Sequence, residues 1–328
     1  MSPGPASLCY REPNVAVIVL NWNGANVTSR CLTSVVGLDY PSYTVVVVDN
    51  GSVDGSPADL CSEFPDVELI ALERNMGLSE GYNAGLRWAL TRGHDYALLL
   101  NNGVILRPDV LRLLVDAAER HPDAGLVSPK IYLGQPPSDR IYWTGGWLTL
   151  KPWGAPTRGY RQRERGRFDD AREADLAANT AVLARCQMVQ EVGLLDPVYF
   201  YMCEDFDWSM RARQQGYRVL YEPRARAWHL ESSTIGFLSH RMVYYYVRNM
   251  WLLIDRYYPG WRAMRATLAI QLFLMMLMFV FTGRPDAVRV PVWAWLDYRR
   301  RRFGEATFRF QSDVPGSERP TQCEECRA

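Results

Sequence analysis

Short apolar runs alternate with amphipathic segments along the first part of the chain. The runs are rich in valine, leucine and isoleucine and predict strands at 15–20, 45–48, 67–72, 96–100 and 124–128. Between them, apolar residues recur at helical spacing and predict helices at about 26–36, 79–91 and 108–120. Strands that are apolar throughout are buried on both faces. The pattern therefore predicts an α/β fold with a mostly parallel, Rossmann-like sheet and helices on both faces.

The pattern changes after residue 129. Residues 134–172 are rich in Gly, Pro, Arg and Trp and predict loops, with room for antiparallel strands around 141–150. Residues 204–215 return to helical spacing, with Asp207 and Arg211 one turn apart, and residues 217–221 predict another strand.

The most apolar stretch of the chain is 266–283, which holds one glutamine and no charged residue. It is just long enough to be a transmembrane candidate, and arginines on both sides give it no orientation. Nearby tryptophans and tyrosines could anchor it at a membrane interface. We expect a helix that dips into one leaflet, or a membrane-facing hairpin; the alternative is a buried core helix.

These patterns divide the chain into four parts. We expect a flexible tail at 1–13, an α/β catalytic domain at 14–240, a helical membrane-associating region at 241–304 and a second tail at 305–328.

Composition narrows the possible partners and the compartment. The net charge of +1 gives no field that would favour nucleic acid, so no nucleic-acid partner is expected. The seven cysteines are scattered, and the first 13 residues lack the pattern of a secretory signal, which favours a reducing, cytoplasmic location. Cys323 and Cys326 form one CxxC without a second pair, so zinc is not expected there.

Polar residues follow the predicted strands at their carboxyl ends. Asn21 and Asn23 follow the first strand, Asp49 follows the second, and Asn101 and Asn102 follow the strand at 96–100. In open parallel sheets, ligands bind at this edge. The Asp49 carboxylate suits ribose hydroxyls or a nucleobase donor; the alternative is a solvated turn.

Six segments together resemble family 2 glycosyltransferases of the GT-A fold, in particular a bacterial, rhamnosyltransferase-like branch. The resemblance covers roughly residues 15–302. The segments are VAVIVLNWNG, VVVVDNGSVDGS, ERNMGLSEGYNAGL, LLLNNGVILRPDVL, GLLDPVYFYMCEDFDWSMRARQQGYRV and the pair Trp228-His229.

The resemblance implies a nucleoside-diphosphate sugar as donor. Residues at the end of the first strand and Asp49 would hold its base and ribose, and the segment from 75 to 85 would lie near the nucleotide. The residues concerned are Leu20, Asn21, Asn23, Asp49, Asn75, Gly77, Gly81, Asn83 and Gly85. For Gly81 and Gly85, close packing of a helix on the sheet is an equal alternative.

The segment Asn101-Asn102-Gly103 departs from the family pattern. Its third position is usually the aspartate that binds Mg²⁺ or Mn²⁺ at the diphosphate, and His229 matches the histidine that reaches the metal or the diphosphate. Three outcomes are open. The two asparagines, His229 and the diphosphate hold a weak metal, or arginines and helix N-termini replace it, or the chain has lost catalysis.

Glu204 and Asp205 match the family's catalytic carboxylates. The resemblance implies that Asp205 takes the proton of the acceptor hydroxyl and that Glu204 orients the acceptor. The alternative is that acidic residues simply favour a helix N-terminus. Asn179 and Thr180 stand where relatives often carry smaller residues near the donor sugar, so the usual donor cannot be assumed.

The expected activity is inverting transfer from a nucleoside-diphosphate sugar, dTDP-rhamnose being one candidate, to a lipid-linked or cell-surface glycan acceptor. We expect it at the cytoplasmic face of a bacterial plasma membrane, with the protein peripheral or monotopic. The alternative is a catalytically impaired member that binds sugar nucleotide or a partner enzyme, because Gly103 lacks the metal-binding carboxylate.

Overall fold

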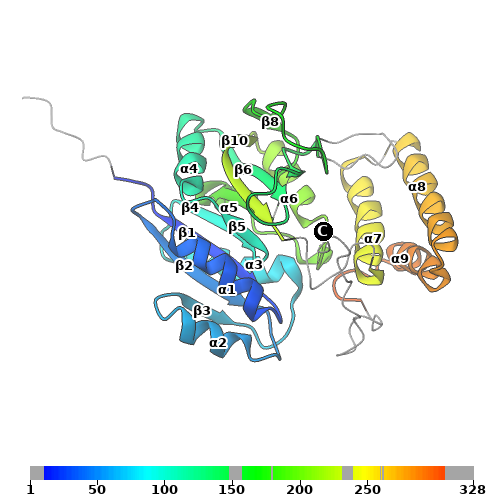
Figure 1. Ribbon diagram of the computed structural model, residues 1–328. Helices are drawn as coiled ribbons and strands as arrows, with labels where there is room; N and C mark the ends of the chain where they lie inside the picture. The colour runs from blue at the N-terminus through cyan, green and yellow to red at the C-terminus, as the bar shows by residue number, and fades with distance from the viewer. Residues whose placement is uncertain are drawn as a thin grey trace, which may run out of the picture.

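The computed structural model describes residues 11–147, 157–178, 180–230, 239–258, 260 and 262–306. Its centre is a single sheet (Figure 1). The strands are β1 (Val15–Asn21), β2 (Tyr43–Asp49), β3 (Glu68–Ala71), β4 (Tyr96–Asn101), β5 (Val104–Leu106), β6 (Ala124–Leu133), β7 (Ile141–Trp143), β8 (Arg172–Ala174), β9 (Ala181–Arg185) and β10 (Arg218–His229).

The strand order across the sheet is β3-β2-β1-β4-β9-β6-β10-β5, with β7 beside β6 and β8 beside β10. Strands β3, β2, β1 and β4 pair in parallel, and so do β6 and β10. Strands β5, β7, β8 and β9 pair antiparallel with their neighbours. The β1–β2, β1–β4 and β6–β10 parallel ladders are longer than any antiparallel one, and the predicted α/β class with a mostly parallel sheet is confirmed.

Helices cover both faces of this sheet. The helices of the described residues are α1 (Ala25–Val36), α2 (Ser56–Glu63), α3 (Gly77–Thr91), α4 (Val110–Arg120), α5 (Cys186–Val192), α6 (Glu204–Gln214), α7 (His240–Tyr257), α8 (Arg262–Phe281) and α9 (Arg289–Arg299), with 3-10 turns η1 (Pro197–Tyr199) and η2 (Pro285–Val288). Helices α1 to α6 accompany the sheet, whereas α7 to α9 stand beside it. Alternate residues of β1 point to opposite faces. Val17 packs with α1, α2 and α4, whereas Ile18 packs with α3, α5 and α6.

The contact between α3 and the sheet depends on glycine. A Cβ atom added to Gly85 would lie 2.4 Å from Ile18 Cγ2, and one added to Gly81 would lie 2.6 Å from Leu20 Cδ1. Both distances are far below a normal carbon–carbon contact, so these glycines let the helix lie directly on the strand.

Several elements differ from the sequence prediction. The predicted strand at 124–128 extends to Leu133, and the one at 217–221 extends to His229, because the two run in parallel beyond the apolar runs. The prediction missed β9, which inserts antiparallel between β4 and β6. It also missed α2 and α5, which are too short to show a helical period.

Helices α7, α8 and α9 stand together beside the sheet (Figure 1) and share a hydrophobic core. Helix α7 also contacts α6, one of the helices that pack on the sheet. Arg256 Nη1 and Tyr257 Oη of α7 donate to Asp207 Oδ1 of α6 at 2.6 and 2.8 Å. The predicted ion pair of Asp207 with Arg211 is present at 2.8 Å. The division into domains at 14–240 and 241–304 stays a prediction.

The apolar stretch 266–283 lies largely within α8. This helix is long and apolar enough to cross a membrane, which by itself is weak evidence for a span, and only 17% of its most apolar window is buried. Leu268, Leu272, Met275 and Phe279 pack inward at helical spacing. The low burial does not fit the alternative of a buried core helix.

Candidate active site

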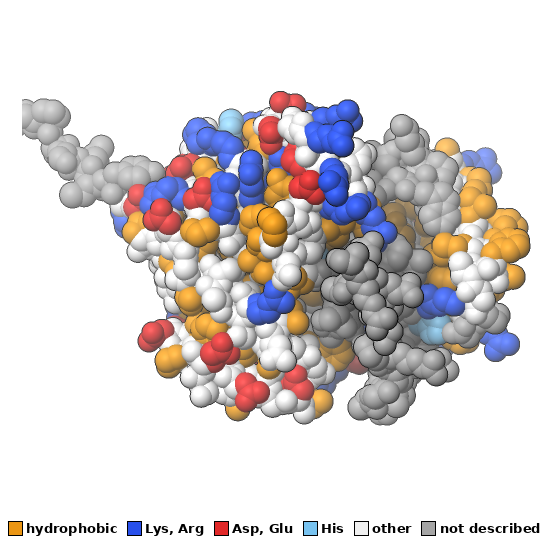
Figure 2. Space-filling model, in the orientation of Figure 1, with side chains coloured by type: hydrophobic (Ala, Val, Ile, Leu, Met, Phe, Trp, Pro, Cys, Tyr) orange, Lys and Arg blue, Asp and Glu red, His pale blue; other side chains and the backbone are white. Residues whose placement is uncertain are grey.

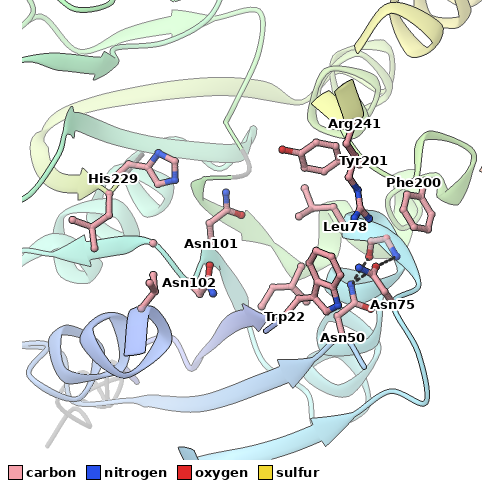
Figure 3. A pocket seen from close by; sticks show the side chains of 15 residues that line it. Trp22, Asn50, Asn75, Leu78, Asn101, Asn102, Phe200, Tyr201, His229 and Arg241 are labelled. Atoms are coloured by element: carbon pink, nitrogen blue, oxygen red, sulfur yellow. Dashed lines mark hydrogen bonds between the residues drawn. The ribbon is translucent and has the colours of Figure 1, made fainter. Parts of the chain in front are cut away.

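A pocket lined by both polar and apolar side chains lies at the carboxyl ends of β1 and β4, where the start of α3 and the first turn of α7 also meet (Figure 3). This is the edge of the sheet at which the sequence predicts a ligand. The residues that line the pocket are Leu20, Trp22, Val27, Asn50, Asn75, Gly77, Leu78, Asn101, Asn102, Gly103, Phe200, Tyr201, His229, Leu230 and Arg241.

The turn after β4 forms one wall. Asn101 Oδ1 accepts a hydrogen bond from the Tyr82 hydroxyl at 2.6 Å. Asn102 Nδ2 donates to Thr28 Oγ1 of α1 at 3.1 Å. Both amides are thus held by neighbouring helices, and both line the pocket as the sequence predicts.

His229, at the end of β10, completes this wall. A Cβ atom added to Gly103 would lie 3.6 Å from His229 Nε2, so an aspartate at 103 would place its carboxylate beside the imidazole. The ring of Tyr142 lies 4.8 Å from the imidazole, centroid to centroid. Burial lowers the pKa of His229 to about 4, so the imidazole is neutral at physiological pH.

The opposite wall is a network of backbone and amide groups at the start of α3 (Figure 3). Asn50 Nδ2 donates to Asn75 Oδ1 at 3.2 Å and to the Gly77 carbonyl at 3.0 Å. Asn50 Oδ1 accepts from the Met76 amide at 2.9 Å. Asn75 and Gly77 were predicted from the sequence. Asn50 was missed.

Asp49 and its partners are not among the residues that line the pocket. Asp49 Oδ1 accepts hydrogen bonds from Asn21 Nδ2 at 2.7 Å and from Ser52 Oγ at 2.6 Å. Asn23 Oδ1 accepts from the Val53 amide at 2.8 Å. These side chains join the loops after β1 and β2, which carry Trp22 and Asn50 into the pocket. Asp49 and Asn50 are adjacent at the end of a strand, where successive side chains point to opposite sides. Only one of the two can therefore face the pocket.

Asn83 lies on the inner face of α3, away from the pocket lining. Its amide donates to the Leu195 carbonyl at 2.8 Å and accepts from the Leu195 amide at 3.0 Å. Asn83 therefore joins α3 to the segment that precedes η1.

The carboxylates Glu204 and Asp205 open α6 directly after a strained turn. Phe200, Met202 and Cys203 all have positive φ, at 59°, 69° and 72°. Such values are costly for residues with a side chain and recur at functional sites. The Asn249 amide of α7 donates to the carbonyls of Tyr199, Tyr201 and Met202, each at 2.8 Å.

The two carboxylates act electrostatically on the pocket wall without being among its lining residues. Burial raises the pKa of Tyr82 well above its usual value, and the charges of Glu204 and Asp205 add to this effect. Burial likewise raises the pKa of Tyr201, with a further contribution from Glu204. Glu204 is buried and Asp205 is half-buried. Tyr82 thus bonds to Asn101 and also feels the charges of the two carboxylates.

Sequence reasoning missed several pocket residues. Trp22 lies within a segment that the sequence singles out, but only its neighbours Leu20, Asn21 and Asn23 were predicted, and of these three Leu20 lines the pocket. Arg241 comes from α7 and stacks over the Trp22 ring, with Cζ 4.8 Å from the centroid. Nothing local in the sequence connects these two residues. Asn179 lies outside the described residues, whereas the Thr180 carbonyl accepts from the Asn101 amide at 3.1 Å.

A tightly held divalent cation does not fit the donor set of this pocket. Mg²⁺ and Mn²⁺ prefer several oxygen ligands, with carboxylates foremost. Among the described lining residues, no aspartate or glutamate is present. In the same part of the chain, no group of three or more His, Cys, Asp or Glu side chains could hold a metal ion. Neutral His229 and two amides would remain as protein ligands.

The fold is shared with solved glycosyltransferases. The structure of GalNAc-T7 with UDP, GalNAc and Mn²⁺ aligns with a TM-score of 0.57 at 19% identity, over 72% of this chain and 47% of that one. The mannosyltransferase PcManGT from Pyrobaculum calidifontis, in complex with GDP-Man and Mn²⁺, aligns with a TM-score of 0.55 at 17% identity, over 89% and 76% of the two chains.

Curated relatives lie in the same class. An N-acetylglucosaminyl-diphospho-decaprenol L-rhamnosyltransferase of Mycobacterium tuberculosis is 25% identical over 79% of this chain and 92% of its own length. A poly-beta-1,6-N-acetyl-D-glucosamine synthase of Staphylococcus epidermidis is 22% identical over 79% of this chain and 60% of its own length. The model of the "Glycosyltransferase like family 2" matches residues 13–244. The expected resemblance is thereby confirmed: with a GT-A fold and this match over most of its length, the chain belongs to glycosyltransferase family 2.

Proposed function

We propose that this glycosyltransferase moves a sugar, with inversion, from a nucleoside-diphosphate sugar in this pocket to an acceptor hydroxyl that Asp205 deprotonates. The observation that carries the proposal is the carboxylate pair at the start of α6. A strained turn precedes the pair, and the charges of the pair contribute to the raised pKa of Tyr82, which bonds to Asn101 of the pocket. Strain at a turn that presents two carboxylates is expected of a preorganised site, because a surface helix start needs none.

The proposed chemistry is a single displacement. The acceptor oxygen forms a bond to the anomeric carbon while the bond from that carbon to the diphosphate oxygen breaks. Asp205 accepts the hydroxyl proton and later releases it to solvent. Glu204, buried beside it, would orient the acceptor. Attack opposite the leaving group inverts the anomeric configuration, so no covalent enzyme intermediate forms.

The pocket offers groups suited to a nucleotide donor. Trp22 provides an aromatic face on which a base can stack. The asparagine amides at 50, 75, 101 and 102 can exchange hydrogen bonds with ribose and phosphate oxygens. We propose dTDP-rhamnose as the first donor to test, because the Mycobacterium relative is named as an L-rhamnosyltransferase.

The acceptor that we propose is a lipid-linked or cell-surface glycan at the cytoplasmic face of a bacterial plasma membrane. Hydrophobic side chains gather along the outer side of α8 (Figure 2), including Ile270, Phe273 and Val280, which are more than half exposed. Trp293 of α9 is also exposed and suits a membrane interface. Because the opposite face of α8 packs on α7 and α9, we propose that it lies in one leaflet without spanning the bilayer.

The test is transfer by the purified full-length chain to a polyprenyl-diphosphate-linked N-acetylglucosamine, with dTDP-rhamnose, UDP-N-acetylglucosamine and GDP-mannose supplied in turn. One donor should be consumed, and NMR of the product should show an inverted anomeric centre. Asp205→Asn should lower turnover by about 10²–10⁴-fold. Glu191→Gln, an exposed carboxylate change on α5, is the matched control and should leave turnover unchanged.

Gly103 supports the rival proposal of a catalytically impaired protein that binds sugar nucleotide or a partner enzyme. The two proposals differ in outcome. Nucleotide binding without turnover of any donor, in the presence or absence of Mn²⁺, would favour the impaired protein. Turnover that is lost in Asp205→Asn would refute it.

A further inference from the structure

The charge of the pocket differs from what a metal-dependent site requires. Of the fifteen residues drawn in Figure 3, Arg241 is the only one with a charged side chain at neutral pH. His229, on the far side of the pocket from Arg241, is buried. A diphosphate carries at least two negative charges, and burying it without a compensating cation would be costly.

Arg241 is placed to provide that positive charge. It lies in the first turn of α7, where the hydroxyl of Ser239 caps the helix by accepting from the Met242 amide at 3.2 Å. Its side chain reaches toward Trp22, with Cζ 4.8 Å from the centroid of the ring (Figure 3). Stacking on an aromatic face restrains the orientation of a guanidinium.

Guanidinium chemistry suits this ligand. An arginine stays protonated at any physiological pH, and its planar fork can bond two phosphate oxygens at once. The positive end of α7 adds to the potential at the same place. Asn102 and His229, across the pocket, can bond to the remaining phosphate oxygens without adding charge.

We propose that Arg241 binds the diphosphate of the donor and supplies the positive charge that a metal bound by the usual aspartate supplies in relatives. Nucleotide binding by this chain then needs no divalent cation. The inference rests on the proposed function, since it assigns one subsite of the same pocket. It also explains how the turn Asn101-Asn102-Gly103 can lack a carboxylate and still belong to a working site.

The experiment measures nucleotide binding and requires no turnover. The purified full-length chain is titrated by calorimetry with dTDP, UDP and GDP and with the matching monophosphates, in EDTA and then in Mn²⁺. We expect at least one diphosphate to bind in EDTA, with an affinity that Mn²⁺ changes by less than about threefold. Arg241→Gln should weaken diphosphate binding by about 10- to 100-fold and remove most of the preference over the monophosphate.

Two variants control for charge and folding. Arg262→Gln removes the same charge from an exposed position at the start of α8 and should bind like the wild type. Arg241→Lys keeps the charge but loses the fork, and its affinity should lie between those of the wild type and Arg241→Gln. The melting temperature of each free variant shows whether the fold is intact.

The outcomes separate this inference from the function on which it rests. Diphosphate binding that appears only with Mn²⁺, or that Arg241→Gln leaves unchanged, overturns the inference while the proposed function stands. Absence of nucleotide binding by the wild type in both buffers overturns the proposed function as well.

Discussion

Asn249 of α7 provides the sharpest test of how this fold prepares its carboxylate pair. The side chain is fully buried, and its amide nitrogen lies 2.8 Å from each of three carbonyl oxygens, those of Tyr199, Tyr201 and Met202. Its Oδ1 accepts from Arg248 Nε at 3.0 Å. The perturbation is Asn249→Ala, which removes these bonds without adding volume.

The magnitude follows from the turn that these bonds hold. An amide nitrogen has two hydrogens, so its three contacts correspond to about two full hydrogen bonds, each worth about 1 kcal/mol net. Carbonyls left unsatisfied in the interior add to the loss. The residues with positive φ at 200, 202 and 203 cost about 1 kcal/mol or more each and would relax once released. We expect Asn249→Ala to lower the free energy of unfolding by about 3 kcal/mol, or the melting temperature by about 6–12 °C.

Relaxation of the turn moves the start of α6, so activity should fall more than stability explains. A displacement of about 1 Å can cost about 100-fold in rate. We expect kcat to fall by about 10- to 100-fold, with a much smaller change in nucleoside-diphosphate affinity. The assay pairs thermal unfolding with steady-state kinetics at a temperature where the variant is fully folded.

Val247→Ala is the matched control, because Val247 is fully buried in the same helix but packs within the core of α7, α8 and α9. It should lose about 2 kcal/mol of stability and keep its kcat. If Asn249→Ala and Val247→Ala lose the same stability and both keep kcat, the idea that Asn249 holds the carboxylates in place is wrong.

Four further outcomes test other parts of the structure. Gly103→Asp places a carboxylate beside His229, so Mn²⁺ should raise the melting temperature of this variant and leave that of the wild type unchanged. Burial holds the pKa of His229 near 4, below its unfolded value of 6.5, so the unfolded chain takes up a proton first as the pH falls. Stability should therefore drop by about 2 kcal/mol between pH 7.5 and pH 5, and urea unfolding should show a flatter profile for His229→Gln. Gly85→Ala would force a methyl group against Ile18 and should cost about 1–3 kcal/mol in a denaturant titration without changing kcat. Phe273→Glu on the exposed face of α8 should reduce sedimentation with anionic vesicles but leave nucleotide binding intact; equal sedimentation would contradict the proposed membrane contact.

Local periodicity explains why much of the fold was predictable. The apolar runs of β1 and β2 depend only on neighbouring residues, and the polar residues after them mark the strand ends. Strand β9 could not be found in this way, because five residues without a turn signal are equally compatible with a loop or a strand. Its position between β4 and β6 is set by pairing across the sheet.

In the candidate site, too, some residues were predictable from the sequence and others only from the tertiary structure. The sequence by itself determined that asparagine amides would gather at the carboxyl edge of the sheet, since strand ends of a parallel sheet meet there. His229 was expected at this site only from the family resemblance. Only the tertiary structure decided that Asn50, and not Asp49, lines the pocket, because the choice depends on which face of the strand end each side chain takes. Arg241 reaches Trp22 only because α7 packs beside the sheet. Such contacts join segments that are far apart in the chain, and no local pattern of residues records them.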